Sequence, residues 1–432
     1  MDIKQICVCA NDASIKMAAL DSETKNKALV KIAEALQINK DKIIAANEKD
    51  LKRSEEEKLA SPLLKRLKFD EKKINDVVEG IKSLIGLEEP IGKTMLSTML
   101  DEELDLYKVT CPIGVIGIIF ESRPDALVQI STLCLKSGNS VLLKGGREAL
   151  ETNRALANVI EEASVAAGLP QGWITLLESR DDVNEMLKMD KYIDLVIPRG
   201  SNEFVRYIMD NSKIPVMGHA DGICHVYVDS DASLDMATKI TVDSKTQYVA
   251  VCNATETLLV HESIADKFLP ALKTELEKKN VEIFGDAGTQ KIISVKPASD
   301  DDWATEYLDY TISIKLVTDL DEAIKHINTY GSGHTDCIVT NNKNNAVKFM
   351  NLVDSGNVFW NASTRFSDGF KYGFGAEVGI STSKLHARGP VGLEGLTSYK
   401  YMLIGNGQIA DDYATNKKSF KHVKMNKHIE DI

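Results

Sequence analysis

The stretch CPIGVIGIIFESRPDALVQISTLCLKSGNSVLLKGG, residues 111–146, predicts a strand, a helix and a second strand in succession. The apolar, β-branched run at 115–120 favours a buried strand. Pro124 follows it, and a proline near the first turn is typical of a helix start. We expect this helix to end at Lys136, because a glycine and an asparagine come soon after it. A second short apolar run at 140–144 completes a parallel strand–helix–strand unit.

The same pattern continues on both sides of this unit. The runs WITLL, DLVIP and HVYV are further apolar strands with helical segments between them, and residues 12–90 have helical periodicity. Strands that alternate with helices predict an α/β protein with an open, wound parallel sheet. Such sheets bind ligands at the carboxyl ends of their strands. A second α/β segment follows, and the lysine-rich residues after about 411 predict a loosely attached tail.

Composition limits the classes of function. The 432 residues carry a net charge of −12, which argues against a general nucleic-acid surface. No run approaches the ~20 apolar residues that span a bilayer, and charged residues interrupt any signal peptide near the N-terminus. The cysteines lack CxxC spacing, which favours reduced thiols in the cytoplasm and predicts neither a disulfide framework nor a metal site. They are Cys7, Cys9, Cys111, Cys134, Cys224, Cys252 and Cys337.

The sequence around Cys252 allows two interpretations of this cysteine, a core residue or a nucleophile. The stretch QYVAVCNATETLLV, residues 247–260, puts Cys252 inside an apolar, strand-like run. A free cysteine in such a run is often a small core residue. As a thiolate it would instead be a nucleophile, and Asn253 or the Cys252 peptide N–H would then stabilise a developing oxyanion. These residues alone leave both interpretations open.

Two turns suit a dinucleotide. The glycines of CPIGVIGIIF precede a strand and not a helix, so they are not the usual dinucleotide fingerprint. Lys144 ends a predicted strand, where its side chain can reach ribose hydroxyls, and Arg147 can meet a 2′-phosphate. Gly200 and Ser201 begin a predicted helix, whose backbone amides suit a pyrophosphate. The alternatives are a basic surface turn at the first position and an ordinary turn at the second.

Glycine-rich loops near the C-terminus carry further basic residues, among them Arg365, His386 and Arg388. Loops of this kind on a rigid scaffold are commonly binding loops. The alternative is a set of turns at a subunit contact. The residues alone do not separate these two interpretations.

The chain resembles a known family. The resemblance is carried by the 111–146 stretch and by HADGICHVYVD, VCNATETLLVH, DWATEYLD, YGSGHTDCIVT, NASTRFSDG and AEVGISTSKLHARGP. These blocks are similar, in order, to those of the glutamate-5-semialdehyde dehydrogenases, also called γ-glutamyl phosphate reductases, within the aldehyde dehydrogenase superfamily. The resemblance covers the chain to about Gln408. It implies NADPH-dependent reduction of L-glutamyl 5-phosphate to L-glutamate 5-semialdehyde and phosphate, in proline biosynthesis.

The resemblance also implies catalytic roles. Cys252 matches the nucleophile that forms a thioester with the substrate. Ser122 and Asn253 are the candidate oxyanion donors. Hydrolytic aldehyde dehydrogenases carry a glutamate base where this chain has His219, and a reductase that releases phosphate needs no activated water.

The remaining roles concern the cofactor and the anions of the substrate. Residues that match cofactor contacts are Lys144, Arg147, Gly200, Ser201 and Glu306. Arg147 stands where NAD-preferring relatives often have a glutamate, so we expect NADPH. For the phosphate and the α-carboxylate of the substrate we expect Arg123, Arg365 and Arg388 in some combination. No metal is expected.

The implied architecture is aldehyde dehydrogenase-like. A wound parallel-sheet cofactor domain takes residues 1–225, including the helical N-terminal part, and an α/β catalytic domain takes 226–397. Strands at 97–112 and 398–408 form a small β arm for homo-oligomerisation, followed by the polar tail at 411–432. Association with glutamate 5-kinase is left open. Two alternatives remain: a hydrolytic NAD-linked aldehyde dehydrogenase, and a catalytically silent binding partner of a pathway kinase.

Overall fold

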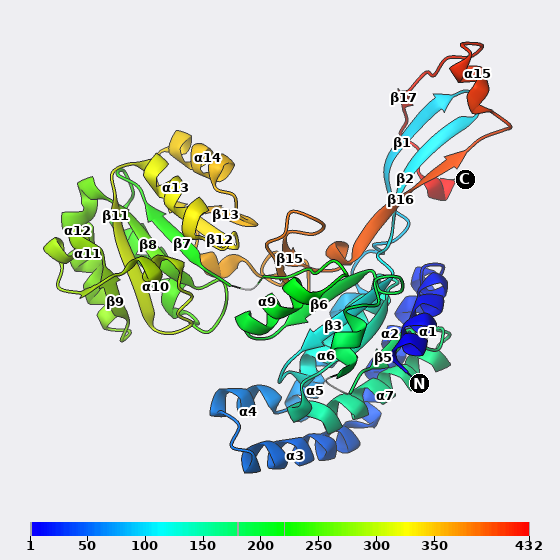
Figure 1. Cartoon of the computed structure of the whole chain (residues 1–432), viewed down its shortest axis with the longest axis horizontal. Coiled ribbons are helices and arrows are strands. Elements are labelled where there is room, and N and C mark those ends of the chain that lie inside the picture. The colour runs from blue at the N-terminus through cyan, green and yellow to red at the C-terminus, as the bar shows by residue number, and fades with distance from the viewer. Residues whose placement is uncertain (1, 179–180, 220, 432) are drawn as a thin grey trace.

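Figure 1 shows a computed structural model that describes residues 2–178, 181–219 and 221–431. Two α/β bodies and a projecting β arm make up the described chain. The first body is coloured blue to green, the second green to yellow, and the arm combines cyan strands with the orange and red end of the chain. None of the helices in the described residues is long and apolar enough to cross a membrane.

The chain begins with helices, as the periodicity predicts. They are α1 (Ile3–Met17), α2 (Ser22–Ile38), α3 (Lys40–Glu56), α4 (Ser61–Leu67) and α5 (Glu71–Ile85). The carboxylates of Asp21 and Asp70 accept hydrogen bonds from backbone amides in the first turns of α2 and α5, which stabilises both helix starts. The apolar faces of these helices pack into the core of the first body.

The first body contains a four-stranded parallel sheet of order β5-β4-β3-β6. Its elements are β3 (Val115–Phe120), α6 (Pro124–Lys136), β4 (Ser140–Lys144), α7 (Leu150–Ala166), β5 (Ile174–Leu176), α8 (Asp181–Met186), β6 (Leu195–Arg199) and α9 (Asn202–Asn211). The predicted strand–helix–strand unit is therefore confirmed. A 3-10 turn (Arg147–Ala149) precedes α7.

The second body is built on a seven-stranded sheet of order β10-β9-β11-β8-β7-β12-β13. Its strands are β7 (Cys224–Val228), β8 (Thr255–His261), β9 (Glu282–Gly285), β10 (Lys296–Pro297), β11 (Thr311–Val317), β12 (Thr335–Val339) and β13 (Asn357–Trp360). Its helices are α10 (Leu234–Thr246), α11 (Glu262–Glu277), α12 (Ala287–Ile292), α13 (Leu320–Tyr330) and α14 (Lys343–Leu352), with 3-10 turns at Asp300–Ala304 and Thr364–Phe366.

Two predicted domain limits are corrected. The boundary after residue 225 falls inside β7, which pairs with β8 and β12 and not with the first sheet. An apolar strand does not reveal by its pattern which sheet it joins. At the other limit, β14 (Gly379–Ser381), β15 (Gly389–Val391) and the 3-10 turn Glu394–Leu396 lie within the predicted catalytic domain. Val391 and Leu396 nevertheless pack into the core of the first body. The assignment of cofactor binding and catalysis to separate domains stays a prediction.

The arm is a four-stranded antiparallel sheet of order β16-β2-β1-β17. Its elements are β1 (Thr94–Asp101), β2 (Leu104–Pro112), β16 (Thr397–Ile404), α15 (Ala410–Ala414), β17 (Val423–Lys424) and a terminal 3-10 turn (Ile429–Asp431). β16 pairs with β2 from Thr397↔Pro112 to Ile404↔Asp105, whereas residues 97–101 belong to β1. The role of the segments 97–112 and 398–408 in oligomerisation stays a prediction.

The prediction of a loosely attached tail is wrong. The Lys421 N–H donates to the Leu100 carbonyl at 2.7 Å, and the Tyr413 hydroxyl donates to Asp101 at 2.9 Å. Tyr413 also stacks on Phe420, with 4.3 Å between ring centroids. A few aromatic anchors thus attach a lysine-rich segment whose composition suggested a tail.

The two α/β sheets present opposite ends to the region between them. Ser122, Lys144 and Gly200 follow the carboxyl ends of strands in the first sheet, as expected. Cys252 and His334 precede the amino ends of strands in the second sheet. The expectation that ligands meet carboxyl ends therefore fits the first sheet alone.

Candidate active site

Cys252 lies in a turn between α10 and β8, and not within a strand as its apolar neighbours suggested. The turn leaves its side chain partly exposed, whereas Cys134, Cys224 and Cys337 are fully buried. Partial exposure is what a nucleophilic thiol requires and a core cysteine does not. The burial pattern therefore favours the nucleophile interpretation.

A glycine contact holds this turn close to the start of β7. A Cβ atom added at Gly222 would lie 2.3 Å from the Cys252 carbonyl oxygen and 2.4 Å from its Cα. The Cys224 thiol also donates to the Cys252 carbonyl at 3.1 Å. The backbone of Cys252 is thus fixed against β7, and only glycine fits at the point of contact.

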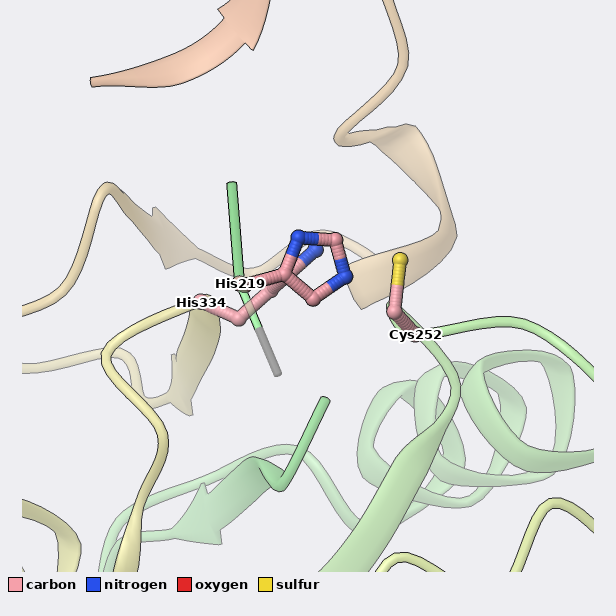
Figure 2. A group of neighbouring side chains, drawn as sticks. All are labelled: His219, Cys252 and His334. Carbon is pink, nitrogen blue, oxygen red and sulfur yellow. The ribbon is translucent and has the colours of Figure 1, made fainter. Parts of the chain in front are cut away.

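Two histidines lie beside Cys252, and Figure 2 shows their rings close together next to the cysteine side chain. Ligand atoms of His219, Cys252 and His334 all lie within 4.8 Å of one another. The imidazole rings meet edge to face, with 4.8 Å between centroids. Burial lowers the pKa of His219, whose Nδ1 is 2.6 Å from the Ile380 carbonyl oxygen. His219 is therefore a neutral imidazole near pH 7, at the position where the resemblance put a glutamate in hydrolytic relatives.

His334 was missed by the sequence analysis. It lies in the quoted block YGSGHTDCIVT, just before β12. Its proximity to Cys252 depends on the strand order β8-β7-β12. A parallel pattern of strands and helices does not reveal that order, so no local signal marks His334.

Two arginines interact electrostatically with the thiol of Cys252. Arg365 donates a hydrogen bond from Nε to Gln247 at 2.9 Å, and its pKa is lowered by burial and raised by the charge on Cys252. Burial also lowers the pKa of Arg199, as does Arg123, while Glu377 and Cys252 raise it. Arg199 and Arg365 thus each interact electrostatically with Cys252, and Arg123 interacts with Arg199. The sequence predicted Arg123 and Arg365 but not Arg199, although the adjacent Gly200 was a predicted cofactor contact.

Arg388 lies in a different environment. Its guanidinium donates to the Asp354 carboxylate at 3.0 Å and to the Asp354 carbonyl at 2.9 Å. It lines a pocket together with Leu87 and Lys93. Its predicted contact with a substrate anion stays a prediction.

The candidate oxyanion donors differ in what they already bind. The N–H and the hydroxyl of Ser122 donate to the Glu148 carboxylate at 2.6 and 2.8 Å. The side-chain amide of Asn253 donates one hydrogen bond to the Ser367 carbonyl at 2.8 Å and has a second N–H. Asn253 and the Cys252 peptide N–H therefore stay the predicted oxyanion donors.

The predicted cofactor residues lie on two turns of the first body. Lys144 ends β4, and its ammonium donates to the Gly145 carbonyl at 2.6 Å. Arg147 begins the following 3-10 turn with a side chain that is 81% exposed, 3.6 Å from Glu57. An exposed arginine paired at that distance retains most of its capacity to bind a phosphate.

The second turn brings Glu306 next to the start of α9. Ser201 caps this helix by accepting a hydrogen bond from the Phe204 N–H at 3.4 Å. The adjacent Asn202 donates from its side chain to the Glu306 carboxylate at 2.6 Å. A helix N-terminus beside a carboxylate fits the pyrophosphate and a ribose of a nicotinamide dinucleotide. Asn202, which the sequence analysis did not single out, joins the two.

Comparison with known proteins places the chain among relatives. The aldehyde dehydrogenase family model matches residues 1–291 and 292–401. A γ-glutamyl phosphate reductase of Ruminiclostridium cellulolyticum is 80% identical over 432 residues, which is 100% of each chain. One from Acetivibrio thermocellus is 72% identical over 427 residues, 99% of each chain.

A solved structure agrees with these sequences. The crystal structure of γ-glutamyl phosphate reductase from Thermotoga maritima superposes with a TM-score of 0.93 at 41% identity, covering 95% of this chain and 100% of that one. An acetylating aldehyde dehydrogenase from Geobacillus thermoglucosidasius, at 17% identity and a TM-score of 0.64, shares the fold. The chain therefore belongs to the γ-glutamyl phosphate reductases, within the aldehyde dehydrogenase family.

Proposed function

We propose that this chain reduces L-glutamyl 5-phosphate to L-glutamate 5-semialdehyde and inorganic phosphate with NADPH, as a step of proline biosynthesis. Relatives with the corresponding name match the chain over its whole length. One observation carries the mechanism, which is that a partly exposed cysteine interacts electrostatically with two arginines, Arg199 and Arg365. That arrangement suits a thiol that attacks a doubly anionic substrate.

Activation of the thiol depends on its neighbours. His219 is the candidate base, because a ring nitrogen lies within 4.8 Å of the Cys252 sulfur and one bridging water would carry the proton between them. Arg199 and Arg365 then stabilise the thiolate, since their charges interact favourably with it. The same cations attract the phosphate and the carboxylate of the substrate.

The reaction proceeds through a thioester. The Cys252 sulfur attacks the acyl carbon, the bond from that carbon to the phosphate oxygen breaks, and phosphate leaves with the electron pair. The Cys252 peptide N–H and the Asn253 side-chain amide hold the oxyanion that forms on the way. The nicotinamide, when bound, supplies the hydride that reduces the thioester carbonyl. The carbon–sulfur bond then breaks, and Cys252 leaves as a thiolate ready for the next turnover.

We propose that the enzyme prefers NADPH to NADH. The 2′-phosphate distinguishes NADPH from NADH, and the exposed guanidinium of Arg147 is suited to bind it. Lys144 and Glu306 orient the riboses, while the start of α9 holds the pyrophosphate.

The β arm has an exposed apolar surface. The strands of the arm expose large apolar side chains, which are Met95, Leu96, Tyr399, Tyr401, Leu403, Ile404 and Val423. Exposed apolar groups gathered on one small sheet are typical of an interface between protein chains. We propose that a second copy covers this sheet and that the enzyme works in the cytoplasm. Association with glutamate 5-kinase stays a prediction without a structural argument.

The hydrolytic alternative needs a direct test, because a neutral His219 could also activate water. Purified protein is incubated with pyrroline-5-carboxylate and NADP⁺, and reduced cofactor is followed with and without inorganic phosphate. We expect reduction that requires phosphate and that Cys252→Ala abolishes. Equal rates without phosphate would identify a hydrolytic dehydrogenase, and no reduction under either condition would favour the silent binding partner.

A further inference from the structure

His219, Cys252 and His334 form a set of potential metal ligands. They come from three separate segments, and one ligand atom from each lies within 4.8 Å of the other two (Figure 2). Two imidazoles and one thiolate are the ligand types that Zn²⁺ prefers. The cysteine spacing predicted no metal site, because such spacing reports only on ligands that are close in sequence.

The hydrogen bonds of the two rings orient them as metal ligands. The Nδ1 of His219 is 2.6 Å from the Ile380 carbonyl oxygen, and the Nδ1 of His334 is 2.8 Å from the Thr335 hydroxyl. Each Nδ1 is therefore occupied, which leaves Nε2 for another partner. Histidines that bind metals usually have their second nitrogen held in this way.

A second observation points independently to a missing ligand. His334 is fully buried, and its Nε2 has no hydrogen-bond partner within the described residues. A buried polar atom without a partner is destabilising, and such atoms are uncommon in folded proteins. A cation at the junction of the three side chains would satisfy this nitrogen.

We propose that Zn²⁺ binds to His219 Nε2, Cys252 Sγ and His334 Nε2, with the fourth tetrahedral position left to water. Binding forms a zinc–sulfur bond and releases the thiol proton to solvent, without any change of oxidation state. The zinc-bound sulfur no longer attacks the acyl phosphate. Zn²⁺ is therefore a reversible inhibitor that protects the nucleophile, and this binding does not depend on the substrate.

Neighbouring charges moderate the affinity. Arg199 and Arg365 lie close enough to interact with Cys252, and they repel a divalent cation. Glu377 interacts with both Arg199 and His219, and its carboxylate opposes that repulsion. We expect weaker binding than at structural zinc sites rich in cysteine.

Cobalt(II) is the probe, because Zn²⁺ has no absorption of its own. Titration of the purified enzyme with Co²⁺ should produce a thiolate-to-cobalt charge-transfer band and the strong visible bands of tetrahedral cobalt. Cys252→Ser should abolish the charge-transfer band, and His334→Gln should weaken the apparent affinity at least ~10-fold. Cys9→Ser is the matched control, because it removes an exposed thiol on α1 and should leave the titration unchanged.

A measurement on the unaltered chain keeps the test independent of folding defects. Zn²⁺ should slow alkylation of Cys252 by iodoacetamide, as followed by mass spectrometry, and a chelator should restore the rate. The proposal is overturned by an unchanged alkylation rate, by the absence of a charge-transfer band at saturating Co²⁺, by dependence of the band on Cys9, or by full affinity in a folded His334→Gln variant.

Discussion

At the scale of single residues, Gly222 fixes the position of the nucleophile Cys252. An added methyl group would meet the Cys252 backbone at 2.3 to 2.4 Å, closer than packed atoms approach. Backbone cannot rotate away as a flexible side chain can, so the turn must shift. We predict that Gly222→Ala lowers kcat by at least ~100-fold, because a displacement of about 1 Å at a reacting group has that effect. Steady-state kinetics on the purified variant measure the loss.

Gly80→Ala is the matched control for this substitution. Gly80 lies in α5, and an added Cβ there would meet nothing within 4 Å. Alanine is favoured over glycine inside a helix by about 0.5–1 kcal/mol. The control should keep full activity and unfold at a slightly higher temperature. Full activity in Gly222→Ala would contradict the proposed contact.

Glu377 gives the site a pH dependence. Burial raises its pKa to about 7, with a further rise from Asp368, while the Gly369 N–H and Arg199 oppose the rise. The folded state therefore holds a proton that the unfolded state, with a carboxyl pKa near ~4.3, has lost. Stability falls as pH rises from about 4.5 to about 7, because the folded state binds more protons in that window.

Glu377→Gln should reduce this dependence. A glutamine keeps an oxygen for the Gly369 N–H, which lies 2.8 Å from the native carboxylate, and it does not titrate. The fall in unfolding free energy between about pH 5 and 8 should shrink by ~1–3 kcal/mol, after allowance for solvent screening. Urea unfolding at several pH values measures it. Identical slopes for the variant and the parent chain would refute the role of Glu377.

Some site residues lie at the ends of strands or helices that the sequence predicts, and others come to the site only through tertiary packing. Lys144 and Ser201 stand at the ends of recognisable strands or helices, so local pattern locates them. Arg199 ends β6 as Lys144 ends β4, so the same local pattern marks it. Glu377 and His334 join the site only through tertiary packing, and no spacing rule brings them together.

At the scale of elements, the turn after β4 carries the cofactor preference. Arg147 begins the 3-10 turn there, and its contact with Glu57 is exposed and long. We predict that Arg147→Glu raises KM for NADPH by at least ~10-fold, since a charge-assisted hydrogen bond contributes about 1.5–3 kcal/mol. NADH lacks the 2′-phosphate, so its KM in the same variant is the internal control. Equal effects on both cofactors would show that Arg147 does not bind that phosphate.

Most elements could be predicted because their apolar runs have clear strand or helix periods. The strands at 115–120 and 140–144 were predicted with their bounds. The run around Cys252 does not form a strand. Val249, Ala250 and Val251 are apolar, but they lie in an irregular segment before β8 and are only half-buried. A short apolar run alone does not show whether its residues form a buried strand.

At the scale of the whole molecule, the C-terminal segment protects the arm. β17 pairs with β1 and occupies its outer edge. We predict that truncation after Gln408 exposes this edge and causes self-association, because an open strand pairs readily with other chains. Light scattering during size-exclusion chromatography measures the effect. Tyr413→Phe, which removes one hydrogen bond to Asp101, should leave the assembly unchanged, and an unaltered assembly after truncation would refute this role.

The domain limits show what sequence patterns omit at this scale. The chain enters the second body at β7 and returns to the core of the first body by Val391. The sequence pattern does not change where the chain passes from one body to the other, because strands alternate with helices in both. The predicted division into two continuous domains was therefore too simple.

The central claim is that Cys252 carries the acyl group and that phosphate, not water, removes it. The most direct test is intact-protein and peptide mass spectrometry after incubation with pyrroline-5-carboxylate and NADP⁺ in phosphate-free buffer. We predict a glutamyl adduct on the Cys252 peptide that persists without phosphate and disappears when phosphate is added. An adduct on another residue, or one that water clears at the same rate as phosphate, would contradict the account.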